Sequence, residues 1–338
     1  MRTTVLGGSG VRVTELAFGA AALGNLYTPL DDRAAADTVA AAWDAGIRTF
    51  DTAPHYGLGL SERRLGAALR GRPRDAYTVS TKVGRLLIPG GTGGDDLANG
   101  FAVAATHHRV WDFSADGVLR SLEASLERLG LDRVDVALLH DPDDHLDQAL
   151  AEAYPALERL RAEGVVGAIG AGMNQTRALT RIIRDTDVDT VLLAGRYTLL
   201  EHGALDELLP EAAARGRSVI IGGVLNSGLL AHPGPGARYD YAPAPRPLLD
   251  RALRLKAVCE RHGVPLRAAA LRFPFGHEAV ASVLTGARSA EEVRDTVDML
   301  RLPVPDALWT DLRASGLLPS HAPFPSSTSR NTGSEGPS

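Results

Sequence analysis

The chain has 338 residues, 44% of them hydrophobic and 23% charged, which is the composition of a globular protein able to bury a full core. Its net charge of −5 argues against nucleic acid or an anionic membrane surface as the main partner. Cys259 is the single cysteine, so an internal disulfide is excluded, and no apolar run approaches the roughly 20 residues of a membrane span. We therefore expect a cytoplasmic protein.

Short apolar, β-branched runs alternate along the chain with longer segments of helical period. The opening residues TTVLGGSGVRV predict a small hairpin. The strands expected after it cover 13–18, 48–53, 77–82, 134–139, 165–170, 190–194, 218–222 and 281–285. The expected helices cover 32–45, 61–70, 115–129, 147–163, 175–185, 205–215, 247–262, 266–275 and 289–300.

This alternation predicts a closed (β/α)8 barrel that forms one domain over residues 1–317. An open, doubly wound sheet is less favoured, because FGAAALGN after the first strand lacks a G-x-G-x-x-G turn. Residues 84–113 are expected to form a loop that is too long for a bare connection and therefore functional. Residues 318–338, rich in Pro, Ser and Gly, are expected to be a disordered tail.

In such a barrel the C-terminal ends of the strands face the active site. Asp51, Lys82 and His140 stand at three of these ends, and Tyr56 follows in the loop DTAPHYGLGLSE. A tyrosine, with a pKa of about 10, handles protons poorly at neutral pH unless its anion is stabilised. A Lys82 ammonium would lower that pKa, and Asp51 would hold Lys82 charged. His140 could then hydrogen-bond the reacting oxygen. Each residue alone could be structural, but together they supply an acid–base device.

The chain resembles the aldo-keto reductase family over nearly its whole length. The resemblance is carried by LGGSGVRVTELAFG, FDTAPHYGLGLSERRLGAAL, STKVGR, SLERLGLDRVDVALLHDPDD, GAIGAGMN, NSGLL and VLTGARSAEEV. It implies a catalytic tetrad with one member as the general acid/base, namely Tyr56, together with Asp51, Lys82 and His140. It also implies NAD(P) bound across the barrel mouth without a Rossmann motif, which suits the missing glycine fingerprint.

The resemblance further implies a set of cofactor-binding residues. Asn174 in GAGMN would hold the carboxamide, and Tyr197 in AGRYT would stack on the nicotinamide. The segment VLNSGLL would bind the pyrophosphate through Leu225, Ser227 and Gly228. The remaining positions implied for the cofactor groove are Gly19, Gly286, Arg288, Glu292 and Asp295.

The segment LTGARSAEEVRDT bears on the choice between NAD and NADP. NADP-preferring relatives resemble IPKSxxxxRxxEN, in which a lysine and an arginine bind the 2′-phosphate. Gly286 and Glu292 stand at those two positions here. A carboxylate repels a phosphate and could accept a hydrogen bond from a free 2′-hydroxyl, so NAD is expected, although Arg288 could partly restore phosphate binding. The structural alternative is that Glu292 only stabilises the N-terminus of its helix.

The segment HDPDDH, residues 140–145, could suggest a metal site, but no further histidine stands at another strand end, so no metal is expected. Asp141 replaces an aromatic residue common in the family, which indicates a polar pocket. His55, Trp111 and His108 are candidates to line it, and a polar pocket with one stacking aromatic suits a sugar. The segments APHYGLGLSE, RVWDFS and LLHDPDD are similar to the aldose 1-dehydrogenase branch, which oxidises L-fucose and related D-threo-aldoses to lactones.

The expected function is therefore NAD-dependent oxidation of an aldose at C1, by a monomer or weak homo-oligomer. A pyridoxal 4-dehydrogenase, as in a sister branch, and a general NAD(P)H-dependent carbonyl reductase remain alternatives. A lyase with a Schiff base on Lys82 is disfavoured, because Asp51 would keep that amine charged. A non-catalytic nucleotide-sensing subunit is disfavoured by the complete tetrad.

Overall fold

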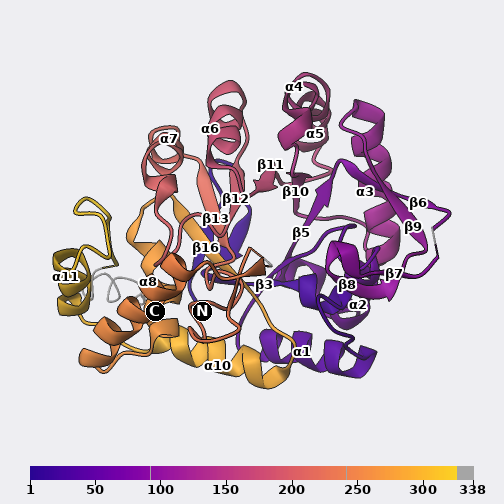
Figure 1. Ribbon diagram of the computed structural model, residues 1–338. Helices are drawn as coiled ribbons and strands as arrows, with labels where there is room; N and C mark the ends of the chain where they lie inside the picture. Colours follow the sequence, from indigo (N-terminus) through magenta and orange to yellow (C-terminus); the bar gives the residue numbers. More distant parts are fainter. Residues whose placement is uncertain (92, 241, 326–338) are drawn as a thin grey trace, which may run out of the picture.

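The computed structural model describes residues 1–91, 93–240 and 242–325. Its centre is a closed barrel of parallel strands, which confirms the predicted fold class (Figure 1). In barrel order the strands are β3 (Leu16–Gly19), β4 (Thr49–Asp51), β5 (Thr78–Val83), β10 (Val136–His140), β11 (Ala168–Met173), β12 (Thr190–Ala194), β13 (Ser218–Gly222) and β16 (Val280–Gly286). Each lies within or beside an expected strand.

Helices surround the barrel (Figure 1). They are α1 (Asp32–Asp44), α2 (Leu60–Leu69), α3 (Ala115–Leu129), α4 (Leu146–Gln148), α5 (Tyr154–Ala162), α6 (Thr176–Asp185), α7 (Leu208–Ala214), α8 (Arg246–Arg261), α9 (Leu266–Arg272), α10 (Ala290–Arg301) and α11 (Asp306–Ala314). Helix α3 matches its expected bounds because both ends are capped: Ser114 accepts a hydrogen bond from the Gly117 amide, and Gly130 adopts φ 63°. The helix expected over 147–163 is present as an unbroken helical segment over 146–162, in which a π-helical turn at Ala149–Ala153 lies between α4 and α5.

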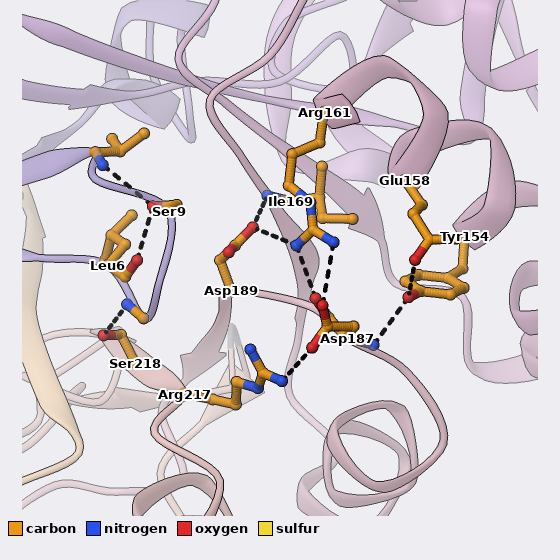
Figure 2. A network of polar contacts seen from close by, with 12 residues as sticks. Leu6, Ser9, Tyr154, Glu158, Arg161, Ile169, Asp187, Asp189, Arg217 and Ser218 are labelled. Carbon is orange, nitrogen blue, oxygen red and sulfur yellow. Dashed lines mark hydrogen bonds and ion pairs between the residues drawn. The ribbon is translucent and has the colours of Figure 1, made fainter. Parts of the chain in front are cut away.

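The predicted N-terminal hairpin is present as β1 (Thr3–Val5) paired with β2 (Arg12–Thr14). The strand expected over 13–18 is therefore two strands, because the chain leaves the hairpin before it enters β3. Leu6 and Val13 pack against side chains of the barrel strands and plug the N-terminal end of the barrel. Figure 2 shows this end, where Ser218 lies beside Leu6 and the Asp189 carboxylate lies between the Ile169 amide and Arg161.

The prediction that segment 84–113 is a loop is wrong. It folds into two antiparallel ladders that together form an insertion between β5 and α3 (Figure 1). In one ladder β6 (Arg85–Pro89) pairs with β9 (His107–Trp111), and in the other, which lies between them in the sequence, β7 (Asp95–Asp96) pairs with β8 (Phe101–Ala104). These strands have two to five residues, and β6 (RLLIP) and β9 (HHRVW) lack the clean alternation of apolar and polar residues that reveals a strand in sequence.

Packed structure continues beyond the expected domain boundary at residue 317. Leu318 and Ala322 are buried, and the Phe324 ring stacks on Trp309 with centroids 6.2 Å apart. These apolar residues bury surface against α11, which the Pro- and Ser-rich composition concealed. The remainder of the expected tail, 326–338, lies outside the described residues. Within the described part of the chain, the helices are all too short or too polar to cross a bilayer.

Candidate active site

Adjacent barrel strands bring the predicted tetrad together. Asp51 ends β4, Lys82 lies one residue before the end of β5, and His140 ends β10. The Lys82 ammonium lies 2.6 Å from an Asp51 carboxylate oxygen and donates to the Thr52 carbonyl at 3.0 Å. The second Asp51 oxygen accepts a hydrogen bond of 2.9 Å from Ser80. Asp51 and Lys82 therefore form a buried ion pair whose carboxylate is satisfied on both oxygens.

The charge of Lys82 is set by two opposing effects. Burial by itself would lower the pKa of this ammonium, but the Asp51 carboxylate and the Tyr56 hydroxyl outweigh burial, so the pKa of Lys82 is raised. The Lys82 nitrogen lies 5.3 Å from the centroid of the Tyr56 ring. An ammonium that is charged at neutral pH favours the phenolate form of a neighbouring phenol, and it is not the free amine that a Schiff base requires.

His140 is held neutral. Burial, followed by the positive charges of Arg85 and Lys82, lowers the pKa of its imidazole well below the ordinary value. Its ring centroid lies 6.0 Å from that of Tyr56, with the rings nearly perpendicular at 87°. A neutral imidazole can donate a hydrogen bond to a substrate oxygen without competing for the proton that tyrosine handles.

The loop that carries Tyr56 is held against the loop after β3. Gly57 follows Tyr56 with φ 61°, and a Cβ at Gly57 would lie 2.2 Å from the Gly24 carbonyl oxygen. Only glycine tolerates both this conformation and this close approach. The half-buried Tyr56 ring is flanked by Phe101 of the insertion, with centroids 6.0 Å apart.

A cleft of about 420 Å³ opens beside His140 and is lined by Arg85, Trp111, Asp141, Asp143, Asn174 and Gln175. Asp141 connects the cleft to the tetrad, since its carboxylate lies 3.8 Å from the His140 Nε2 atom. On one side of the cleft the indole ring of Trp111 is accessible to a ligand, because this residue is 44% exposed. Within the described ranges, no group of His, Cys, Asp and Glu side chains is arranged to hold a metal ion.

Arg85, which is not among the predicted site residues, also belongs to this cleft. Its guanidinium forms an ion pair with Asp141 and lies 5.1 Å from the centroid of the Trp111 ring. Burial raises the pKa of Asp141, and the Arg85 charge opposes that shift. A signal was available, because Arg85 closes the segment STKVGR, three residues after Lys82 at the same end of β5.

Of the two histidines expected to line the pocket, neither lines this cleft: His55 lies beside the tetrad, and His108 is exposed on β9. Burial, then Arg85 and Arg109, lowers the pKa of His55 to about 3, so this imidazole is neutral. Its ring lies 5.7 Å from that of His140. His55 therefore borders the tetrad without adding charge to it.

Comparison with known proteins identifies the family. The model of the Aldo/keto reductase family matches residues 15–316. The chain belongs to the aldo/keto reductase family. A D-threo-aldose 1-dehydrogenase from Pseudomonas sp is 48% identical over 92% of this chain and 97% of that relative. A pyridoxal 4-dehydrogenase from Microbacterium luteolum is 41% identical over 93% of this chain and 97% of the relative.

A comparison with solved structures leads to the same family. A holo aldo-keto reductase from Bacillus halodurans is similar with a TM-score of 0.73 and 27% identity, covering 93% of this chain and 96% of that one. The protein is therefore an NAD(P)-dependent oxidoreductase.

The residues expected at the pyrophosphate of this aldo-keto reductase lie in a turn that suits an anion. Leu225, Ser227 and Gly228 follow β13, and Ser227 is exposed. Asn226, Ser227 and Gly228 have positive φ values of 47°, 55° and 92°. Consecutive left-handed residues form a tight turn of the kind whose amide groups bind phosphate oxygens. Asn174, expected at the carboxamide, lines the cleft. These positions fit a nicotinamide dinucleotide.

Tyr197 does not fit its predicted role. Its side chain is completely buried, and its ring packs on Phe273 with centroids 5.2 Å apart. Burial also raises the pKa of its hydroxyl. A ring without accessible surface cannot contact a cofactor, so the prediction that Tyr197 stacks on the nicotinamide is wrong.

The residues expected near the adenosine ribose already make contacts within the protein. Gly286 lies opposite Gly19 where β16 pairs with β3. The Glu292 carboxylate accepts the Arg288 amide at 2.7 Å at the start of α10. The Arg288 guanidinium donates to the carbonyls of residues 26, 28 and 29 at 2.8, 3.2 and 3.1 Å. Asp295 is paired through both oxygens with Arg267. Cofactor contacts at Arg288, Glu292 and Asp295 remain predictions.

Proposed function

We propose that this aldo-keto reductase is an NAD-dependent aldose 1-dehydrogenase that oxidises C1 of L-fucose or a related D-threo-aldose to the lactone. The observation that carries the proposal is the polar cleft beside His140. There Asp141 supplies charged hydrogen-bond acceptors and Arg85 supplies charged donors, next to the exposed ring of Trp111. Such a combination of a flat aromatic face and fixed polar groups suits a pyranose. The relative named D-threo-aldose 1-dehydrogenase supports the same substrate class.

In the proposed reaction Tyr56 is the base that takes the proton of the anomeric hydroxyl. The Lys82 ammonium, held at 2.6 Å by Asp51, stabilises the negative charge on the phenol oxygen. The neutral imidazole of His140 donates a hydrogen bond that orients the hydroxyl. When bound, the nicotinamide supplies the acceptor for the hydride of the anomeric C–H bond. Asp141 and Arg85 hold the remaining hydroxyls, which fixes the face of the sugar that meets the base.

Two features support NAD over NADP. Gly286 and Glu292 stand where NADP-preferring relatives carry a lysine and an arginine, so a 2′-phosphate would meet no cation at these positions. Arg288 in this segment already donates to three backbone carbonyls, and its use for phosphate would break those bonds.

A panel of aldoses tests the proposal, with NAD and NADP supplied separately and reduced nicotinamide followed by absorbance. We expect turnover of L-fucose, D-arabinose or L-galactose, with a higher kcat/KM with NAD than with NADP. The panel includes aldehydes and ketones with NADPH as the control for a general carbonyl reductase. A preference for those carbonyls, or no turnover of any aldose, would contradict the proposal.

Pyridoxal is the second candidate substrate, and two observations favour it. A pyridoxal 4-dehydrogenase is 41% identical over nearly the whole chain. The exposed ring of Trp111 could stack on a pyridine as well as on a sugar. The ratio of kcat/KM for L-fucose to that for pyridoxal, measured on one preparation, decides between the two.

A further inference from the structure

The insertion between β5 and α3 contacts the catalytic loop through a buried ion pair. Arg109 on β9 binds Asp96 on β7 through two parallel hydrogen bonds of 2.7 and 2.5 Å. The two side chains are only 7% and 5% exposed. The Arg109 nitrogen at 2.5 Å from Asp96 also donates to the carbonyl of His55 at 3.1 Å. One planar guanidinium thus connects the insertion to the residue immediately before Tyr56.

A second contact acts on the same loop from β8. The buried ring of Phe101 lies 5.3 Å from the His55 ring and 6.0 Å from the Tyr56 ring, measured between centroids. Strand β8 is itself anchored to the loop after β3, since the Ala102 amide donates to the Asn25 carbonyl at 2.9 Å. The insertion therefore connects two loops of the barrel mouth and encloses the Tyr56 loop between them.

We infer that Arg109 is a positioning residue for Tyr56. Fixed by Asp96, it holds the His55 carbonyl so that the phenol stays beside Lys82 and His140. The inference rests on the proposed role of Tyr56 in proton transfer. Tyr56 lies in a turn without regular secondary structure, so its position depends on such contacts. The rate of proton transfer falls steeply as the distance between the phenol oxygen and the substrate hydroxyl increases.

The competing explanation is that the Arg109–Asp96 pair only stabilises the insertion. Removal of one member of a buried pair destabilises a protein wherever the pair lies, so a loss of stability cannot separate the two roles. The chain offers a matched control in Arg161 and Asp189, which are 3.0 Å apart and 20% and 5% exposed (Figure 2). That pair lies at the opposite end of the barrel and touches no member of the tetrad.

The test compares Arg109→Gln, Arg109→Lys and Arg161→Gln in the full-length chain. We measure kcat and KM for the best aldose, the Kd of NAD, and the Tm. We expect both Arg109 variants to lose kcat by ~10- to 100-fold with little change in the Kd of NAD. Arg161→Gln should lower the Tm by a similar amount and keep its kcat. Arg109→Lys retains a charge opposite Asp96 but cannot also reach the His55 carbonyl. Compared with Arg109→Gln, its Tm should therefore lie closer to the wild-type value, whereas its kcat should stay low.

The pH profile gives a second readout. In the Arg109 variants the phenol is less well held beside the Lys82 ammonium, so the rise of kcat with pH should move to higher pH than in the wild type. A normal kcat and pH profile in Arg109→Lys, or equal kcat losses in the Arg109 and Arg161 variants, would overturn the inference. If the wild type turns over no aldose, the proposed substrate fails, and crystal structures of wild type and Arg109→Gln decide instead. An unmoved Tyr56 hydroxyl would then refute the positioning role, and a displaced one would support it.

Discussion

Replacement of Asp51 by Asn should make the stability of the protein depend on pH in a way that the wild type does not. In the wild type the pKa of Lys82 is raised above its ordinary value, because the Asp51 and Tyr56 contributions outweigh burial. The stabilisation from this shift is complete below the pKa of the unfolded lysine and is lost only as the pH rises through the higher folded value. Between about pH 7 and pH 9 it is therefore constant.

In Asp51→Asn the buried ammonium keeps its desolvation penalty without its carboxylate. Loss of one member of a buried ion pair costs about 3–5 kcal/mol in the free energy of unfolding at neutral pH. Burial then lowers the folded pKa of Lys82 below the unfolded one, so the unfolded chain binds the proton more tightly. Stability must rise with pH, by up to ~1.4 kcal/mol per pH unit, and we expect a gain of about 1–2 kcal/mol between pH 7 and pH 9.

The assay is urea unfolding at several pH values, with Asp135→Asn as the control. Asp135 pairs with Arg74 at 2.7 Å, and an arginine stays protonated throughout this range. The control should lose stability by an amount that does not change with pH. A flat profile for Asp51→Asn, parallel to that of the control, would refute the reasoning that Asp51 keeps Lys82 charged.

Other predictions follow from the same site. Tyr56→Phe should lower kcat by roughly 10²–10⁴-fold and leave the Kd of NAD nearly unchanged; a normal kcat in steady-state assays would remove the tetrad assignment. Glu292→Arg combined with Gly286→Lys should favour NADP over NAD by ~2–4 kcal/mol, or roughly 30- to 1000-fold in the ratio of Kd values. An unchanged ratio would mean that Glu292 only caps α10. Trp111→Ala should raise KM for the aldose by about tenfold without altering cofactor affinity, as titration with NAD checks. Because the pKa of His140 is well below its ordinary value, the kcat profile should show no step from its protonation near neutral pH. Acidification should instead destabilise the fold as the unfolded histidine takes up a proton, which urea unfolding at low pH would detect.

The barrel, and the grouping of Asp51, Lys82 and His140 at its mouth, could be predicted because both depend on local patterns. Parallel strands buried on both faces appear as short apolar runs, and the closed topology then brings the residues at their C-terminal ends together. The catalytic roles of these three residues come from the family resemblance and remain predictions. Arg85 and Arg109 escaped prediction because their partners, Asp141 and Asp96, lie 56 and 13 residues away along the chain, in contacts that the sequence pattern does not reveal.

Tyr197 shows the limit of reasoning from a family motif. The motif marks a position near the cofactor, but the direction of the side chain is decided by packing against Phe273, from a distant part of the chain. Glu292 shows a related limit, because a carboxylate in the first turn of α10 can cap its helix or bind a ribose with the same sequence around it.

The plug at the base of the barrel has a consequence for how the chain folds. The Gly7 amide bonds the Ser218 hydroxyl across 211 positions of sequence, and the Ser282 hydroxyl bonds the Thr14 carbonyl across 268. Strand β3 likewise finds β16 only after nearly the whole chain has been synthesised. Such distant pairings carry a large loop-closure entropy and slow folding. During synthesis one hydrogen-bonding edge of β3 therefore stays unpaired until β16 has been made and closes the barrel. A nascent chain that stops before β16 cannot form the closed barrel.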